Sequence, residues 1–205
     1  MKVKRQMESR VKRLGRPRGF DAELALERAM QVFWKKGYEG TSLPDVEKAM
    51  NINRPSLYAA FGNKRQLFGK VLDRYARELS YAWEALEAPT AREVAERLLF
   101  GAADMLTSPR HPHGCLMVQG ALACGEESDA VRRELCARRA ANEATLRERF
   151  ERARRDGDLP SDASAGDLAR FIATVVRGMS VQAAGGATRA QLRRVARTAL
   201  KAFPS

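Results

Sequence analysis

The chain has 205 residues, of which 44% are hydrophobic and 30% are charged, and its net charge is +12. No run of about 18 apolar residues is present, so the composition indicates a globular cytoplasmic protein and excludes a membrane-spanning one. The basic N-terminus lacks the apolar segment of a secretory signal, and three cysteines without Cys-x-x-Cys spacing argue against a disulfide framework or a zinc finger.

The positive charge is concentrated near the N-terminus. The first 70 residues carry a net charge of +9, whereas the remaining 135 carry +3. A cationic segment beside a nearly neutral remainder predicts that the first part of the chain contacts a polyanion. The alternative is a basic surface that is only solvated.

Helical patterns follow one another along the chain, and strand patterns are nearly absent. Asp21 is expected to cap a helix over residues 22–36, and Thr41 or Ser42 to cap a short helix that ends near residue 49. Further helices are expected over residues 54–61, 63–86, 91–106, 115–124, 129–155, 165–183 and 189–203. The sequence therefore predicts an all-α protein of about nine helices.

Two of these helices are short and are joined by a tight turn. Asn51 tolerates the left-handed conformation that the turn requires, and Pro55 is accepted in the first turn of the following helix, where its missing N–H costs nothing. Two such helices in a strongly basic segment indicate a helix-turn-helix, whose second helix enters the major groove of DNA with its N-terminal residues at the base edges.

The segment GYEGTSLPDVEKAMNINRPSLYAAFGNKRQLF, residues 37–68, resembles the DNA-binding signature of the TetR family of transcriptional regulators. The matching residues are Gly37, Tyr38, Thr41, Ser42, Ser56, Leu57, Tyr58, Phe61 and Lys64. Two features depart from the family pattern: Asn51 replaces a common glycine, and Ala59-Ala60 replaces an aromatic or histidine pair. The resemblance covers about the first 70 residues; beyond them it rests on the number of helices and a Gly-Cys-Leu step at 114–116.

The resemblance implies a repressor that binds a palindromic double-stranded operator as a homodimer and is released by a small-molecule effector. It implies a basic arm with a three-helix DNA-binding domain over residues 1–65 and a helical effector-binding and dimerisation domain over 66–205. It implies neither enzyme activity nor a cofactor. The rival interpretation is an all-helical enzyme or carrier that is merely basic, which would not need Arg54 exposed ahead of a two-turn helix.

Four residues at the start of the second short helix are candidates for reading bases. Arg54 can donate two hydrogen bonds to a guanine, which is the commonest specific contact in the major groove. Asn53 can read a base or cap the helix, and the cap is favoured. Pro55 and Ser56 lie at the correct end for a thymine methyl group or a base edge.

The remaining DNA-binding candidates are expected to contact phosphates or the minor groove. Hydroxyl, phenol and ammonium groups near helix starts suit phosphates, and they are Thr41, Ser42, Tyr58 and Lys64. Arg16 and Arg18 could enter the minor groove, or they could belong to a tail with only non-specific attraction for DNA.

Apolar residues of the C-terminal two-thirds are candidates for a dimer interface and for an effector pocket. The expected interface residues are Leu168, Ile172, Val176, Leu192, Val195 and Leu200. The expected pocket residues are Phe100, Met105, Leu116, Met117, Gln119, Phe171 and Val175. In both cases the alternative is that these side chains only fill the core of the protomer.

Both histidines stand beside a cysteine in the segment RHPHGC, residues 110–115. His111, His113 and Cys115 could form a metal or redox site, because imidazole and thiolate suit soft metal ions. Their spacing matches no recognised metal motif, so the preferred interpretation is a loop with a buried thiol and no metal.

Overall fold

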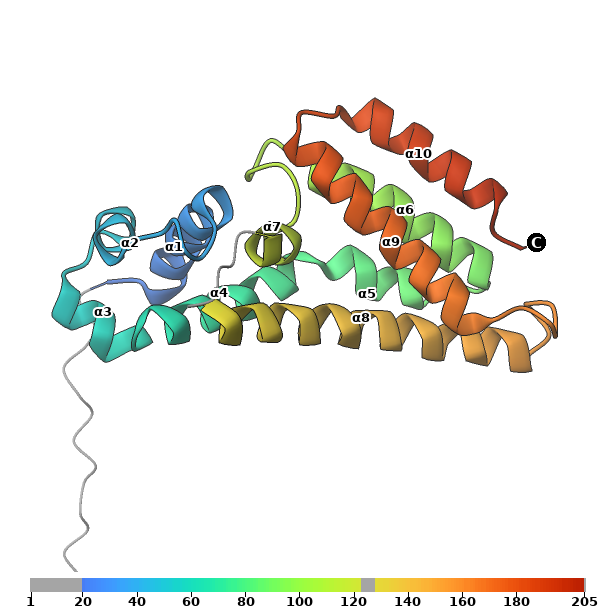
Figure 1. Cartoon of the computed structure of the whole chain (residues 1–205), viewed down its shortest axis with the longest axis horizontal. Coiled ribbons are helices and arrows are strands. Elements are labelled where there is room, and N and C mark those ends of the chain that lie inside the picture. The colour runs from blue at the N-terminus through green and yellow to red at the C-terminus, as the bar shows by residue number, and fades with distance from the viewer. Residues whose placement is uncertain (1–19, 123–127, 205) are drawn as a thin grey trace, which may run out of the picture.

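The computed structural model describes residues 20–122 and 128–204 (Figure 1), and the secondary structure of these residues is entirely helical. None of the described helices is long and apolar enough to cross a membrane. The helices are α1 (Ala22–Lys36), α2 (Leu43–Met50), α3 (Arg54–Phe61), α4 (Lys64–Glu78), α5 (Ser80–Leu86), α6 (Ala91–Leu106), α7 (Leu116–Leu122), α8 (Asp129–Arg155), α9 (Ala165–Ala184) and α10 (Arg189–Lys201).

Most helices begin at a polar residue whose side chain accepts a backbone hydrogen bond. Asp21 caps α1, and Ser42 rather than Thr41 caps α2. Asn53 caps α3 by accepting from the Ser56 N–H at 2.9 Å, and Pro55 lies in the first turn. The expected positions of these helix starts are therefore confirmed, because each follows from a local contact.

The single helix expected over residues 63–86 is two helices. It is interrupted at Leu79, where the backbone N–H bonds to Ala76 O and the carbonyl accepts from Ala82 N. These three-residue spacings tighten the chain and change its direction. The described residues therefore contain ten helices where the sequence predicted about nine.

The helices form two groups along the long axis of the molecule (Figure 1). Helices α1, α2 and α3 lie together at one end, and α4 leads away from α3 towards the other helices. The 27-residue α8 runs along one side of the molecule, while α6, α9 and α10 lie at the end opposite to α3.

Two clusters of buried side chains hold these groups together. The N-terminal core unites α1–α4 with α7 and the start of α8, and its largest fully buried members are Phe33, Leu57, Leu67, Phe68, Leu72, Tyr75, Leu116 and Leu135. The C-terminal core unites α6, α9 and α10 with the second half of α8, around Leu99, Phe150, Ile172 and Met179. Met105 and Cys115 pack against both cores, so they lie where the two groups of helices meet.

Candidate nucleic-acid interface and ligand cavity

The turn between α2 and α3 has the geometry of a helix-turn-helix. Asn51 adopts the left-handed conformation with φ 57° and ψ 45°, as its side chain allows. Leu57 and Phe61 are buried against the N-terminal core, so they fix α3 on α1, α2 and α4. The opposite face of α3 remains open to solvent, because Tyr58 keeps 46% of its surface exposed.

Arg54 stands at the exposed start of α3 and is held by one carboxylate. Its Nε donates to Glu47 Oε1 of α2 at 2.8 Å, while the side chain stays 55% exposed. This contact uses Nε, and the two terminal nitrogens of the guanidinium make no hydrogen bond to a described residue. Because guanine is read by paired N–H groups of arginine, the arrangement presents a group that can read a base. The sequence interpretation did not include Glu47, although its position seven residues before Arg54 places it across the turn.

Most of the other DNA-binding candidates lie around the same end of the molecule. Pro55 is exposed and Ser56 half-exposed in the first turn of α3. Ser42 is exposed, but its hydroxyl donates to Asp45 Oδ2 at 2.8 Å and accepts from the Asp45 N–H, so it caps α2 in the protein alone. Asn53 likewise serves as the cap of α3, which was the favoured alternative.

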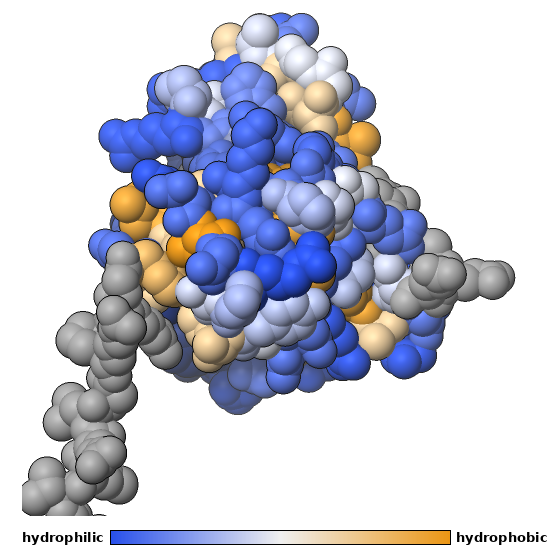
Figure 2. Space-filling view, turned by 90° about the vertical axis from the view of Figure 1, so that its left-hand side faces the viewer, coloured by the Kyte–Doolittle hydropathy of each residue, from blue (hydrophilic) through white to orange (hydrophobic). Residues whose placement is uncertain are grey.

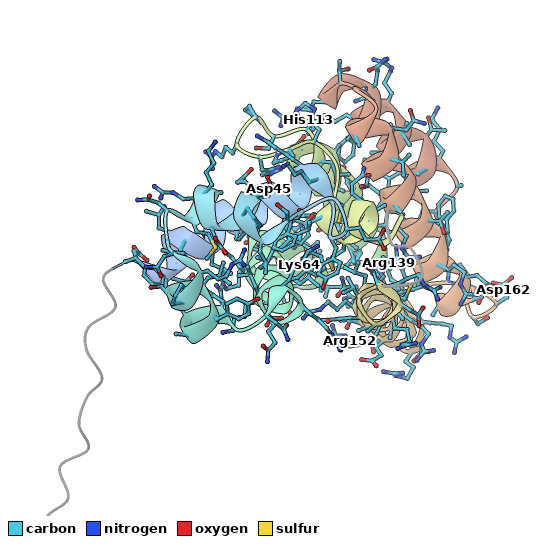
Figure 3. All side chains as sticks on the ribbon, turned by 60° about the vertical axis from the view of Figure 1, so that its left-hand side comes forward. Asp45, Lys64, His113, Arg139, Arg152 and Asp162 are labelled. Carbon is cyan, nitrogen blue, oxygen red and sulfur yellow. The ribbon has the colours of Figure 1, made fainter. Side chains whose placement is uncertain are left out.

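Lys64 begins α4 directly behind the helix-turn-helix (Figure 3). Its ammonium lies 4.5 Å from the centre of the Tyr38 ring, a cation–π contact that directs the side chain. Partial burial lowers the pKa of Lys64, yet an ammonium at this place remains suited to a phosphate.

Two of the predicted DNA contacts are not found on the described part of this surface. Thr41 is buried and its hydroxyl donates to Gly37 O at 2.6 Å, so it holds the loop after α1 and does not present a phosphate contact. Arg16 and Arg18 lie outside the described residues.

The end of the molecule that carries α2 and α3 is mainly hydrophilic. Figure 2 shows this end from the front, with hydrophobic atoms in separate small areas between polar ones. A surface of this kind suits the phosphate backbone of DNA better than an apolar protein partner.

A cavity of about 190 Å³ lies between the two cores, bordered by residues of α4, α5, α6, α7, α8 and α9. Tyr75 and Ser180 form its closed end, since both side chains are fully buried. Trp83, which is 56% exposed, and Asn142 mark the side that opens to solvent. Such a mostly apolar space, closed at one end and open at the other, with few polar groups, is typical of small-molecule sites.

The sequence predicted only part of this cavity. Met105 and Met117 line it as expected. The structure does not place the other expected pocket residues in its wall, and these are Phe100, Leu116, Gln119, Phe171 and Val175. Phe100 instead packs under the Arg193 guanidinium at 4.7 Å, and Leu116 belongs to the N-terminal core.

The sequence missed several residues of the cavity wall, among them Tyr75, Tyr81, Trp83, Arg139 and Ser180. Tyr75 looked like ordinary core on a helix face, and nothing in its spacing indicates that the core is hollow there.

The expected dimer-interface residues also divide into different environments. Ile172, Leu192 and Leu200 are buried in the C-terminal core of the protomer, which corrects their assignment to a dimer interface. Val176 lines the cavity, and Leu168 is partly buried against the C-terminal core. Val195 is 44% exposed and remains available to a partner.

The histidines and the cysteine of the loop before α7 are not gathered around one point. His111 stacks on Trp34 of α1 with 4.5 Å between the ring centres, while His113 is exposed on the α6–α7 loop (Figure 3). Cys115 lines the cavity, where burial raises the pKa of its thiol. The described residues contain no group of three or more metal-binding side chains.

Comparisons with known proteins agree with this architecture. The family model for bacterial regulatory proteins of the tetR family matches residues 25–71, and the tetracyclin repressor-like C-terminal domain matches residues 92–199. The HTH-type transcriptional repressor ComR of Escherichia coli K12 is 34% identical over 193 residues, covering 93% of this chain and 92% of ComR.

Solved structures give the same assignment. A cysteine-substituted variant of the TetR family transcriptional regulator CifR, complexed with 26-bp double-stranded operator DNA, is 46% identical with a TM-score of 0.88 and covers 92% of this chain and 100% of its own. A TetR transcriptional regulator from Rhodococcus sp. RHA1 is 44% identical with a TM-score of 0.61, over 89% of this chain and 98% of its own. The chain therefore belongs to the TetR family, and it is a DNA-binding transcriptional regulator.

Proposed function

We propose that this regulator is a repressor that binds a palindromic operator as a homodimer and leaves it when an effector occupies the cavity. The observation that carries the proposal is the position of the cavity. Met105 and Cys115 line it and pack on both cores, so a ligand there contacts the helices that carry α3 as well as those of the C-terminal domain. The division at residues 65 and 66 is proposed as the boundary of these functional units.

Recognition of the DNA base sequence is assigned to the start of α3. Arg54 offers its guanidinium to a guanine, with Pro55 and Ser56 beside it, while Tyr58 and Lys64 contact phosphates on either side. ComR is named a repressor, and the CifR variant was solved on operator DNA, which supports the same role for this chain. A repressor of this kind acts in the cytoplasm, where its operator lies.

The homodimer is assigned to the exposed faces of α9 and α10. Thr174, Gly178 and Val181 repeat at helical spacing on α9, and all three are exposed. A Cβ on Gly178 would meet no atom within 4 Å, so another helix can approach the backbone there. Val195 and Thr198 form an exposed uncharged stripe on α10. Two copies of these stripes make a four-helix contact that doubles the DNA surface, as a palindromic site requires.

Transmission from the cavity to the DNA is assigned to α4 and α7. Tyr75 lies in the cavity wall near the end of α4, whose first residue, Lys64, follows the helix-turn-helix closely. Helix α7 also packs against α1 and α4, and the His111–Trp34 stack ties the preceding loop to α1. Recognition helices of a dimer must lie about 34–36 Å apart to occupy successive turns of DNA, so a small shift of α4 disfavours binding.

The test uses the full chain and a pool of random-sequence DNA duplexes. Rounds of selection are expected to enrich an inverted repeat whose half-sites lie one helical turn, or a multiple of it, apart. Sedimentation of the same preparation without DNA is expected to show a dimer at micromolar concentration. Enrichment of a single asymmetric site by a monomer would contradict the proposal.

A further inference from the structure

The closed end of the cavity carries a polar group that the described protein leaves without a partner. The Tyr75 hydroxyl is fully buried and makes no hydrogen bond. It lies beside the Cys115 thiol and the N–H of Leu116, at the start of α7, without hydrogen-bond geometry to either. Burial of an unsatisfied hydroxyl costs free energy, so this group is suited to a partner that enters the cavity.

The surroundings of this hydroxyl are uncharged. Met105, Met117 and Ser180 line the cavity with it, and the Ser180 hydroxyl accepts the Cys115 N–H at 2.9 Å. Burial also raises the pKa of Tyr75, which therefore stays protonated and able to donate. A charged ligand group at this end would have no ion-pair partner beside the Tyr75 hydroxyl to offset its desolvation, and Arg139 acts on the neighbouring Cys115 thiol only through its electrostatic field.

Charged residues of both signs occur in the part of the wall formed by α8 and α9. Glu143 bonds to Arg170 and Arg177 at 3.2 and 3.0 Å, so its charge is already neutralised. Arg139 of α8 contacts the Cys136 sulfur at 3.1 Å (Figure 3). This part of the wall therefore disfavours a cation, and Arg139, which forms no ion pair with a described residue, is the one charge whose selection of an anion has to be tested.

We infer that the cavity takes a compact, uncharged and mainly apolar molecule with one hydrogen-bond acceptor, which accepts its hydrogen bond from the Tyr75 hydroxyl. The inference rests on the proposed function, because the cavity is taken to be the effector site. The volume of about 190 Å³ is smaller than the roughly 300–1,000 Å³ of drug-sized sites, so a molecule of single-ring size fits.

The same hydrogen bond gives the ligand a contact with the DNA-binding helices. Tyr75 belongs to α4, and the Trp34 ring of α1 packs edge-on against it with 4.8 Å between the centres. A ligand bonded to Tyr75 therefore acts on the two helices that support α3. It binds more tightly to the arrangement of α1 and α4 in which the Tyr75 hydroxyl can donate to it, and so it favours that arrangement.

The experiment measures three probes of similar size by calorimetric titration of the full chain without DNA. They are ethylbenzene, which is apolar, acetophenone, which carries one acceptor, and benzoate, which is charged. Acetophenone is expected to bind about three- to tenfold more tightly than ethylbenzene, the range for one hydrogen bond. Benzoate is expected to bind more weakly than either.

Two phenylalanine variants locate the hydrogen bond. Tyr75→Phe is expected to abolish the preference for acetophenone and to leave ethylbenzene affinity unchanged. Its unfolding temperature without ligand should not fall, because the hydroxyl has no partner to lose. Tyr81→Phe removes a hydroxyl from the same wall and is expected to keep the preference.

Each other outcome overturns the inference. Tightest binding of benzoate would show that Arg139 selects an anion, and loss of the preference in Tyr81→Phe alone would assign the donor to the wrong tyrosine. Absence of binding by all three probes would refute the inferred class of ligand. Operator binding by the same preparation, measured separately, shows whether the proposed repressor function stands when the ligand class fails.

Discussion

The helix-turn-helix and the C-terminal domain are stabilised by polar contacts of different reach. Between residues 42 and 66 the side-chain hydrogen bonds join residues three positions apart in the chain, as in the caps Ser42–Asp45 and Asn63–Gln66, and the longest, Arg54–Glu47, spans seven positions. In the C-terminal domain Arg193 bonds to Asp104, which is 89 positions away. The DNA-reading element is thus defined locally, whereas the ligand cavity depends on helices brought together from across the chain.

The charged side chains of the two regions also differ in how deeply they are buried. Lys36 and Asp45 form a pair at 2.7 Å at the edge of the DNA-binding end, where both remain solvent-accessible. Arg149 of α8, by contrast, is buried and donates to the carbonyls of Leu86 and Ala88 at 3.0 and 2.7 Å. Surface pairs leave room for a DNA partner, while the buried arginine fixes the loop before α6 to α8.

The largest expected effect comes from a substitution in the C-terminal domain that breaks the dimer and leaves the helix-turn-helix unchanged. Val181→Asp places a charge in the proposed α9–α10 contact, where two copies would bury it twice. We expect monomers and a loss of operator affinity of about 10²–10⁴-fold, because the two half-sites no longer bind together. Sedimentation and DNA titration provide the measurement.

The matched control for this variant lies on another face of the same helix pair. Arg197 of α10 lies beside Phe100 and Arg193, towards α6. Arg197→Asp should leave the dimer intact. A dimeric Val181→Asp protein would refute the proposed interface.

The second prediction concerns the local element alone. Arg54→Ala should cost about 1–3 kcal/mol of binding free energy at one base pair, because one paired contact with guanine is lost. Titration against the operator and against a duplex with that base pair changed measures the loss of discrimination. Lys64→Ala is the control, and it should weaken both duplexes equally. Equal losses on both duplexes for Arg54→Ala would contradict its role in reading a base.

The third prediction tests how closely the cavity wall is packed. A Cβ on Gly101 of α6 would overlap the Tyr81 ring. Gly101→Ala should therefore lower the free energy of unfolding by about 1–3 kcal/mol through overpacking. Gly69→Ala in α4, where a Cβ meets only Glu134 Oε1 at 3.9 Å, should instead stabilise the protein by about 0.4–1 kcal/mol. Chemical denaturation measures the free energy of unfolding of both variants. Equal changes in the two would mean that the Tyr81 ring moves aside without cost.

The fourth prediction concerns the carboxylate that holds Arg54. Glu47→Gln should reduce operator affinity by about 0.2–1 kcal/mol, the range for an exposed ion pair, because the guanidinium is less well oriented. In an Arg54→Ala background the same change should have no effect, which a double-mutant cycle measures. A gain in affinity would show that Glu47 competes with DNA for Arg54.

The smallest expected effect depends on pH. The Lys36 ammonium and the Ser42 cap hold the pKa of Asp45 well below its usual value. A carboxyl with a lowered pKa in the folded state contributes stability above the unfolded pKa of about 3.9 and loses it as the pH falls. Asp45→Asn should therefore lower the unfolding temperature at pH 7, and the difference from the unsubstituted protein should shrink below about pH 4. A constant difference down to acid pH would exclude the ionic contribution.

The sequence by itself determined the helical class, the starts of most helices and the recognition helix. Asp21, Asn53, Asn63 and Thr188 act as caps through bonds to residues two or three positions later, and Leu57 and Phe61 are buried one turn apart. Such features are predictable because a cap or a helical face needs only neighbouring residues.

Only the tertiary structure decided which apolar faces fill the core, line the cavity or remain exposed. Ile172 and Val181 lie on the same helix, yet Ile172 is 1% exposed and Val181 is 47% exposed. The break at Leu79 and the unpartnered Tyr75 hydroxyl likewise depend on packing among helices distant in sequence. Hydrophobic burial has no direction along the chain, so periodicity identifies an apolar stripe but not the helix that covers it.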